Sequence, residues 1–166
     1  MRYFAYGSNM SLPRLLARLP SASKLDVCTL AGHDMRFHKR SVDGSAKCDA
    51  FETARAQDRM IGILFDVDAA QKPALDRIEG LGHGYEIKRV RLVTRSGEST
   101  VAYTYFATWI DRSLLPYSWY LYHVLHGARQ AALPPDYIAR IEAVHSVQDP
   151  DSVRDAMERA IYRKRL

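Results

Sequence analysis

Cysteine is scarce in this 166-residue sequence, and that scarcity excludes several kinds of protein. Only Cys28 and Cys48 occur, and they do not form a CxxC pair. A disulfide-stabilised secreted domain or a cysteine-rich zinc site needs more thiols at closer spacing. Two isolated thiols fit a reducing compartment best, so the sequence predicts a cytoplasmic protein.

Long hydrophobic runs are also missing. No apolar stretch approaches the roughly 20 residues that a membrane-spanning helix needs, and the first residues do not have the layout of a secretory signal. Hydrophobic residues still make up 47% of the chain and charged residues 26%, which is typical of a globular protein. We therefore expect one domain over residues 1–166 that does not associate with a membrane.

The net charge of +5 raises the question of a nucleic-acid partner. Basic residues cluster at 36–40, at 88–91 and in the tail 163–165, but none of these clusters is a long block interleaved with aromatic residues. Cations at the end of a final helix also complement the helix dipole. A solvated basic surface without a nucleic-acid partner is the preferred interpretation, and a basic RNA- or partner-binding module is the alternative.

Hydrophobic periodicity and turn residues divide the chain into a strand-rich first part and a helical last part. Strands are predicted at about residues 2–6, 60–67, 85–94 and 99–108, with shorter pieces across 24–54 broken by Gly32 and by a hairpin turn at Asp43-Gly44. Helices are predicted at about residues 12–19 (with Ser11 as a possible cap), 72–79, 117–130, from Pro135, and after Asp149-Pro150, where Asp149 would cap a helix that buries Val153, Ala156, Met157, Ala160 and Ile161. The expected class is α+β, with a small mixed β-barrel or curved sheet flanked by helices.

Several motifs of catalysis and cofactor binding are absent. Ser8 does not lie in a GxSxG elbow, and the chain contains neither GxxxxGK[ST] nor GxGxxG. The pair His123 and His126 lacks the HExxH spacing of a zinc enzyme, so a core or surface role is expected for it. The other histidines are dispersed without an obvious partner: His33, His38, His83 and His145. No metal and no cofactor are predicted.

The segment YGSNM, residues 6–10, interrupts a strand just before a helical pattern begins. Gly7 permits a sharp turn, and Ser8 and Asn9 bond readily to nearby backbone. A strand that turns into a helix in this way points several backbone N–H groups in one direction, which suits a carboxylate or a developing oxyanion. Many turns of this kind bind nothing, so the pattern alone leaves the role open.

Glu79, in the segment LDRIEG, falls in the last turn of its predicted helix. The carbonyl groups there carry partial negative charge, which raises the pKa of a carboxyl group and makes it a better base. An exposed glutamate without a function is the alternative. Tyr85, Tyr105 and Tyr120 are likewise either core residues or ligand contacts, and their spacing does not decide between these roles.

Taken together, these segments resemble the γ-glutamylcyclotransferase family. The resemblance rests on YFAYGSNM at 3–10, LDRIEG at 75–80, Gly84-Tyr85, Tyr103-Thr104-Tyr105, and the stretch from Tyr120 through HGARQAALPPDYIARIEAV. It extends from about residue 2 to residue 145. It implies a mixed β-barrel with flanking helices and a pocket at one mouth.

The resemblance also implies an activity and a set of site residues. In that family the α-amine of a γ-glutamyl group attacks its own γ-carbonyl, which yields 5-oxoproline and the released amine. Glu79 matches the family's acid–base residue. The positions that match the substrate-binding pocket are Tyr3, Tyr6, Gly7, Ser8, Asn9, Tyr85, Tyr105 and Tyr120.

The identity of the γ-glutamyl compound stays open at this point. Asn9 argues mildly against the glutathione-specific branch, which usually has a different residue after YGS. The loop GLGHG, which carries His83, is expected to shape the leaving-group side. A non-catalytic member of the same fold that binds a small acidic metabolite is an alternative, although the presence of Glu79 counts against it.

Overall fold

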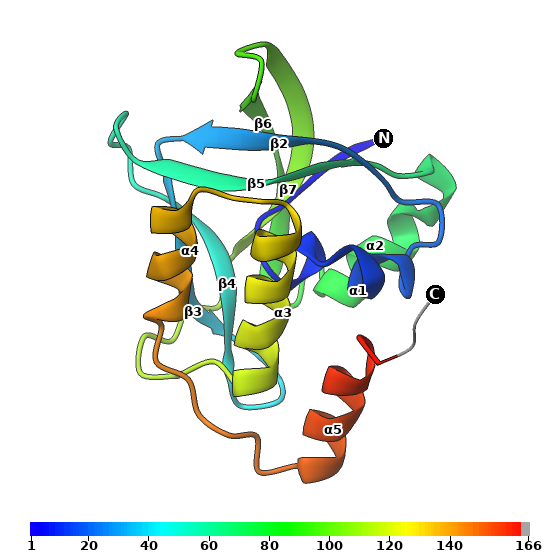
Figure 1. Cartoon of the computed structure of the whole chain (residues 1–166), viewed down its shortest axis with the longest axis vertical. Coiled ribbons are helices and arrows are strands. Elements are labelled where there is room, and N and C mark those ends of the chain that lie inside the picture. The colour runs from blue at the N-terminus through cyan, green and yellow to red at the C-terminus, as the bar shows by residue number, and fades with distance from the viewer. Residues whose placement is uncertain (164–166) are drawn as a thin grey trace.

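The computed structural model describes residues 1–163, and a closed β-barrel forms its centre (Figure 1). The strands follow one another around the barrel in the order β1 (Arg2–Ala5), β5 (Arg59–Asp66), β2 (Ser23–Ala31), β6 (Tyr85–Thr94) and β7 (Ser99–Ala107). β1 and β7 are parallel, with Tyr3 opposite Tyr103, while the other neighbouring strands are antiparallel. The predicted α+β class with a small mixed barrel is confirmed.

A separate hairpin, β3 (His33–Arg40) and β4 (Ala46–Glu52), forms a two-stranded sheet beside the barrel. Its turn contains Asp43-Gly44, as predicted from the sequence. The Asp43 carboxylate accepts hydrogen bonds from the backbone and hydroxyl groups of Ser45, which stabilise the turn. The turn thus joins the two strands of the hairpin beside the barrel.

The helices cover the barrel and the hairpin. They are the 3₁₀ turns η1 (Ser8–Met10) and η2 (Ala69–Gln71), and the α-helices α1 (Leu12–Leu16), α2 (Lys72–Glu79), α3 (Ser118–Gln130), α4 (Pro135–Glu142) and α5 (Ser152–Ala160). α3 packs against η1 and α5 and lies beside α4 (Figure 1). α1 is shorter than the predicted 12–19. The Ser11 side chain does not cap α1; its hydroxyl accepts a hydrogen bond from Tyr162.

The core explains why β1 and β5 are apolar along most of their length. Tyr3, Phe4 and Ala5 of β1 are all buried, so this strand is covered on both faces. Phe65 of β5 and Leu75 of α2 are completely buried as well, which anchors α2 to the molecule. Each such side chain contributes about 1.5–3 kcal/mol through burial. Within residues 1–163, no helix has the length and apolar character that a membrane crossing requires.

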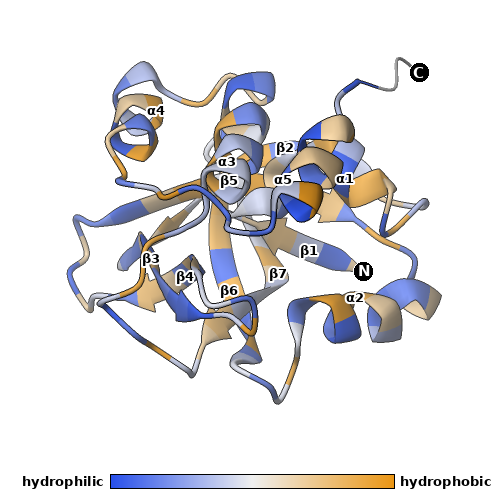
Figure 2. Ribbon diagram, turned by 90° about the horizontal axis from the view of Figure 1, so that it is seen from below, coloured by the Kyte–Doolittle hydropathy of each residue, from blue (hydrophilic) through white to orange (hydrophobic). Residues whose placement is uncertain are grey.

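α5 differs from its prediction in two respects. Val153 and Met157, which the sequence predicts to be buried, are 68% and 69% exposed. Ala156 is exposed as well, and Ala160 and Ile161 are half-buried. The face of α5 that meets the protein is polar instead: Glu158 pairs with Arg14, and Arg159 donates to the Ser118 hydroxyl at 2.8 Å. Figure 2 shows hydrophobic and hydrophilic residues side by side along α5. The apolar spacing therefore predicts the wrong face of α5 to be buried. Ion pairs, rather than apolar contacts, hold this helix against the rest of the protein.

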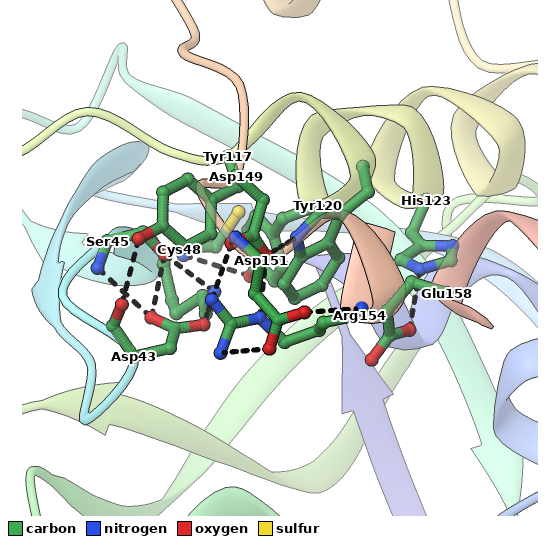
Figure 3. Close-up of polar contacts among 12 residues, drawn as sticks. Asp43, Ser45, Cys48, Tyr117, Tyr120, His123, Asp149, Asp151, Arg154 and Glu158 are labelled. Atoms are coloured by element: carbon green, nitrogen blue, oxygen red, sulfur yellow. Dashed lines mark hydrogen bonds and ion pairs between the residues drawn. The ribbon is translucent and has the colours of Figure 1, made fainter. Parts of the chain in front are cut away.

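The sequence also predicts the wrong capping residue for α5. Asp151, not Asp149, caps the helix by accepting from the Arg154 N–H at 3.0 Å. Asp149 is buried instead, and its carboxylate accepts from Trp119 Nε1 at 2.7 Å and from the Arg154 guanidinium (Figure 3). Of the predicted basic tail, only residue 163 lies within the described part of the chain.

Candidate active site

A small pocket lies where β1 ends. It contains every residue that the sequence analysis placed in a substrate site, together with one that it did not, Cys48. The lining residues are Tyr3, Tyr6, Gly7, Ser8, Asn9, Cys48, Glu79, Tyr85, Tyr105 and Tyr120. Residues more than 110 positions apart in the chain therefore form one small, tyrosine-rich cavity.

The YGSN turn forms one wall of this pocket. After β1 ends, the chain makes a single 3₁₀ turn in which Met10 N–H donates to Gly7 O at 3.0 Å. The first N–H groups of any helical turn have no acceptor inside that turn, so they can serve a ligand. A Cβ on Gly7 would lie 3.1 Å from Cys48 Cβ and 3.2 Å from Tyr120 Oη. Glycine is thus needed here for close approach.

Glu79 is held by a short chain of hydrogen bonds from the YGSN turn. Asn9 Nδ2 donates to Glu79 Oε1 at 2.5 Å and to Tyr3 Oη at 3.1 Å. Arg18 Nη1 in turn donates to Asn9 Oδ1 at 3.0 Å. A guanidinium can only donate, so Arg18 requires the amide oxygen of Asn9 on its side and the amide nitrogen toward Glu79. Arg18 therefore orients the donor that contacts the carboxylate.

The electrostatic setting of Glu79 combines burial with nearby cations. Burial raises the pKa of Glu79 above its ordinary value, and the effects of Arg18, the Asn9 hydrogen bond, Arg14 and Lys39 oppose the rise without cancelling it. The sequence predicted a raised pKa from the position at the helix end, and burial is the main physical cause. A carboxyl group with a raised pKa is suited to accept a proton and return it.

Two tyrosines and Cys48 close the inner end of the pocket. Tyr85 Oη donates to the Cys48 carbonyl oxygen, and Cys48 N–H donates to Tyr120 Oη at 3.0 Å. Figure 3 shows Cys48 and Tyr120 next to each other. Burial raises the pKa of the Cys48 thiol to about 12, so this cysteine is protonated at neutral pH and is a poor nucleophile. Burial likewise raises the pKa of both phenols and keeps them neutral.

The remaining tyrosines are fixed by hydrogen bonds and ring packing. Tyr6 Oη donates to the Tyr105 carbonyl oxygen at 2.7 Å, and Tyr105 Oη donates to Asp76 Oδ1 at 2.5 Å. The rings of Tyr3 and Tyr105 meet edge to face with centroids 6.0 Å apart. These contacts fix the tyrosine rings that line the pocket.

Several residues near the site were missed from the sequence. Arg18, in the turn after α1, and Lys39, on β3, both affect Glu79, and no local motif indicates that they come together. His38 was predicted to have no partner, but its Nε2 lies 2.8 Å from Asp49 Oδ2 in a buried pair. His83 is exposed in the loop after α2.

The histidine pair on α3 has the structural role that the sequence predicted. His123 is completely buried and contacts Glu158 at 3.0 Å. His126 is half-buried and stacks on the ring of Tyr162 with centroids 3.9 Å apart. Among residues 1–163, no three His, Cys, Asp or Glu side chains gather into a cluster that could hold a metal ion.

Comparison with known proteins places this chain in a family. The sequence profile of the AIG2-like family matches residues 59–141, which is half of the chain. The chain belongs to the AIG2-like family. Mouse and human γ-glutamylcyclotransferases are each 26% identical to it over 160 residues, covering 94% of this chain and 85% of theirs.

Solved structures agree on the fold. A γ-glutamyl cyclotransferase superposes with a TM-score of 0.88 at 24% identity, covering 99% of both chains. A yeast γ-glutamyl cyclotransferase specific to glutathione superposes with a TM-score of 0.59 at 12% identity, covering 85% of this chain and 93% of that one. The predicted resemblance is confirmed, and so is the prediction of a γ-glutamylcyclotransferase-like enzyme.

Proposed function

We propose that this protein cyclises a γ-glutamyl group to 5-oxoproline and releases the attached amine or amino acid, with Glu79 as the acid–base residue. The observation that carries the proposal is the contact between Asn9 of the YGSN turn and Glu79 Oε1 inside the tyrosine-lined pocket. That contact joins the YGSN turn, whose first N–H groups can serve an anion, to a carboxyl group of raised pKa.

The glutamyl end of the substrate would occupy the pocket. Backbone N–H groups of Gly7 to Asn9 would hold its α-carboxylate or the γ-carbonyl oxygen as it gains charge, since both are anionic groups that such a turn accommodates. Tyr3 and Tyr105 would flank the aliphatic part of the chain. Contacts at both ends would hold the flexible glutamyl chain folded, which brings the α-amine near the γ-carbonyl and lowers the entropic part of the barrier.

Proton transfer would run through Glu79. A free α-amine has a pKa of roughly 8, so it must lose a proton before it attacks at neutral pH. Among the described residues, Glu79 Oε2 has no hydrogen-bond donor, which leaves this oxygen available to take that proton. The amine nitrogen then bonds to the γ-carbon, and Glu79 returns the proton to the leaving nitrogen as its bond to that carbon breaks. The attacking nitrogen loses its second proton as it becomes the lactam N–H, and the released amine takes up that proton and leaves as an ammonium. No water is consumed.

The experiment that tests the proposal compares substrates with free and blocked α-amines. The protein is incubated with a panel of γ-glutamyl compounds, with and without EDTA, and 5-oxoproline and the released amine are both measured. We expect 5-oxoproline from at least one free-amine substrate and none from its N-acetyl derivative, because acetylation removes the attacking lone pair.

Two outcomes would contradict the proposal. Release of the amine from the N-acetyl substrate at a comparable rate would indicate hydrolysis by water in the same pocket. Binding of γ-glutamyl compounds without turnover would instead indicate a non-catalytic metabolite-binding protein.

A further inference from the structure

Three cations oppose the raised pKa of Glu79, and two of them already have protein partners. Arg18 donates a hydrogen bond to Asn9 of the YGSN turn, and Arg14 is paired with Glu158. The third is Lys39. Within residues 1–163 its ammonium has no hydrogen-bond acceptor and no carboxylate within 4.0 Å, although the residue is only 7% exposed.

The two carboxylates whose charge reaches Lys39 are occupied elsewhere. Asp43 pairs with Lys47 at 2.7 Å, and Glu79 accepts from Asn9. The Lys39 ammonium has no bonded anion, and its partial burial lowers the pKa of Lys39. The site therefore has an unfilled capacity to bind an anion.

Lys39 lies beside the pocket on the side of the loop that follows Glu79. Its Nζ is 4.7 Å from the ring centre of Tyr85, which lines the pocket. The side chain also lies against Gly84, where an added Cβ would come within 3.0 Å of Lys39 Cε and 3.5 Å of Trp109. Residues 80–84 connect Glu79 to Tyr85, so Lys39 borders the segment that leads from the acid–base residue.

This position is the side on which a leaving group would lie. In the proposed reaction Glu79 protonates the leaving nitrogen, so that nitrogen and its substituents must be next to Glu79 while the glutamyl end fills the closed pocket. A substituent carbon bearing a carboxylate would place a negative charge near Glu79, where repulsion must be balanced by a cation. Lys39 is the cation without a partner among the described residues.

We propose that Lys39 binds the carboxylate of the leaving amino acid and so selects γ-glutamyl amino acids over γ-glutamyl amines with an uncharged leaving group. The inference rests on the proposed cyclotransferase function and extends it to a subsite. The YGSN turn and Lys39 would then each hold one end of a substrate with two carboxylates. The geometry also accounts for Gly84, because a side chain there would press on the Lys39 stem.

The test uses two substrates that differ in the leaving carboxylate. γ-Glutamyl-alanine releases alanine, and γ-glutamyl-ethylamide releases ethylamine, which is alanine without its carboxyl group. The measured quantity is the ratio of their kcat/KM values for 5-oxoproline formation. It is determined for the wild type, for Lys39→Met, which keeps most of the stem, and for Lys39→Arg, which restores the charge. Lys88→Met serves as the matched control, because it removes a lysine that is paired with Glu52 away from the pocket.

We expect the wild type to prefer γ-glutamyl-alanine by about 10- to 100-fold, the contribution of one charged hydrogen bond. Lys39→Met should bring the ratio close to one, Lys39→Arg should restore part of it, and Lys88→Met should keep the wild-type ratio. An unchanged ratio in Lys39→Met would overturn the proposal. So would an equal loss for both substrates, which would mean that Lys39 serves the glutamyl end or Glu79 instead.

A binding measurement separates this proposal from the function on which it rests. Calorimetric titration of both compounds into Glu79→Gln, with Lys39 or with Lys39→Met, reports the affinity ratio without turnover. If the wild type forms no 5-oxoproline but the affinity ratio depends on Lys39, the proposed function fails and the subsite stands. If 5-oxoproline forms but neither ratio depends on Lys39, the subsite fails and the function stands.

Discussion

Two glutamates in this molecule, Glu79 and Glu158, lie on helices and near arginines. They differ in whether a cationic side chain contacts the carboxylate directly. Glu79, at the end of α2, contacts one amide, and the nearby cations do not touch it. Glu158, on α5, contacts Arg14 directly. It also contacts His123 (Figure 3). Burial raises the pKa of Glu79, whereas the direct contacts of Glu158 lower its pKa to about 2.

The comparison indicates that direct contact with a cation, rather than residue type or helix position, distinguishes a structural carboxylate from one suited to proton transfer. A buried acid without a bonded cation holds its proton more tightly and can exchange it with a substrate. An acid bonded to a cation stays ionised and contributes to stability. The predictions below test this contrast, beginning with the largest expected effect.

Substituting Glu79→Gln should reduce kcat by about 10²- to 10⁴-fold, which is the usual contribution of a positioned acid or base. The amide is nearly isosteric with the carboxyl group, so what changes is proton transfer. Stability toward urea should be equal to that of the wild type or higher at pH 7, because an unfavourably buried charge has been removed. Wild-type turnover on a validated substrate would eliminate Glu79 as the acid–base residue.

Substituting Glu158→Gln should have the opposite profile. It leaves the buried Arg14 without its counter-charge, so the free energy of unfolding should fall by about 1–3 kcal/mol. Turnover should persist, since Glu158 does not line the pocket. The measurement is urea denaturation at pH 7 beside the same kinetic assay. A variant that is fully stable but inactive would reverse the assigned roles.

Acid should destabilise the protein through the α5 network and not through the pocket. The pKa of Glu158 is lowered to about 2 and that of His123 to about 4, so the unfolded chain binds more protons and stability falls as the pH drops from about 6.5 toward 2. Glu79 has the opposite sign, because its raised pKa makes its contribution complete at low pH and lost as the pH rises.

These opposite signs can be separated by denaturation at several pH values. Glu158→Gln should flatten the acid loss of stability below pH ~4.3, the ordinary value for glutamate. Glu79→Gln should leave that loss in place. If both variants lose stability with acid as steeply as the wild type, the contrast between the two sites is wrong.

Substituting Ser8→Ala should have the smallest effect, a decrease of about tenfold or less in kcat/KM, because it removes at most one hydrogen bond to the substrate. The substrate's own amine is the nucleophile in the proposed reaction, so turnover should not disappear. Mass spectrometry during turnover provides the check. A covalent glutamyl adduct on Ser8 would overturn the cyclisation mechanism.

Much of the fold could be predicted because its signals are local. Pro73 near the start and Gly80 after the end bound α2 at Lys72–Glu79 as predicted, and Gly80 adopts the left-handed conformation (φ 75°) that ends a helix. Local patterns singled out the YGSN turn and Glu79, the family resemblance implied their roles, and the pocket contains both.

The parts that could not be predicted depend on contacts between distant residues. Lys39 reaches the site from β3, Cys48 from β4 and Arg18 from the turn after α1, and no spacing in the sequence relates them. Gly127 of α3 is another example, since a Cβ there would lie 2.4 Å from Ser11 N, an approach that only the folded chain shows. For α5, apolar spacing suggested one face, but ion pairs with Arg14 and Asp149 determine the face that meets the protein.

The most direct test of the account is a titration of the two carboxyl groups in one sample. Carbon-13 NMR of protein labelled at the glutamate side-chain carboxyl follows Glu79 and Glu158 from pH 2 to pH 8, and the two glutamine variants assign the signals. The account predicts that Glu79 titrates above the ordinary value for glutamate of about 4.3 and Glu158 below it. Titration of both groups at the same pH, or of Glu79 below Glu158, would contradict it.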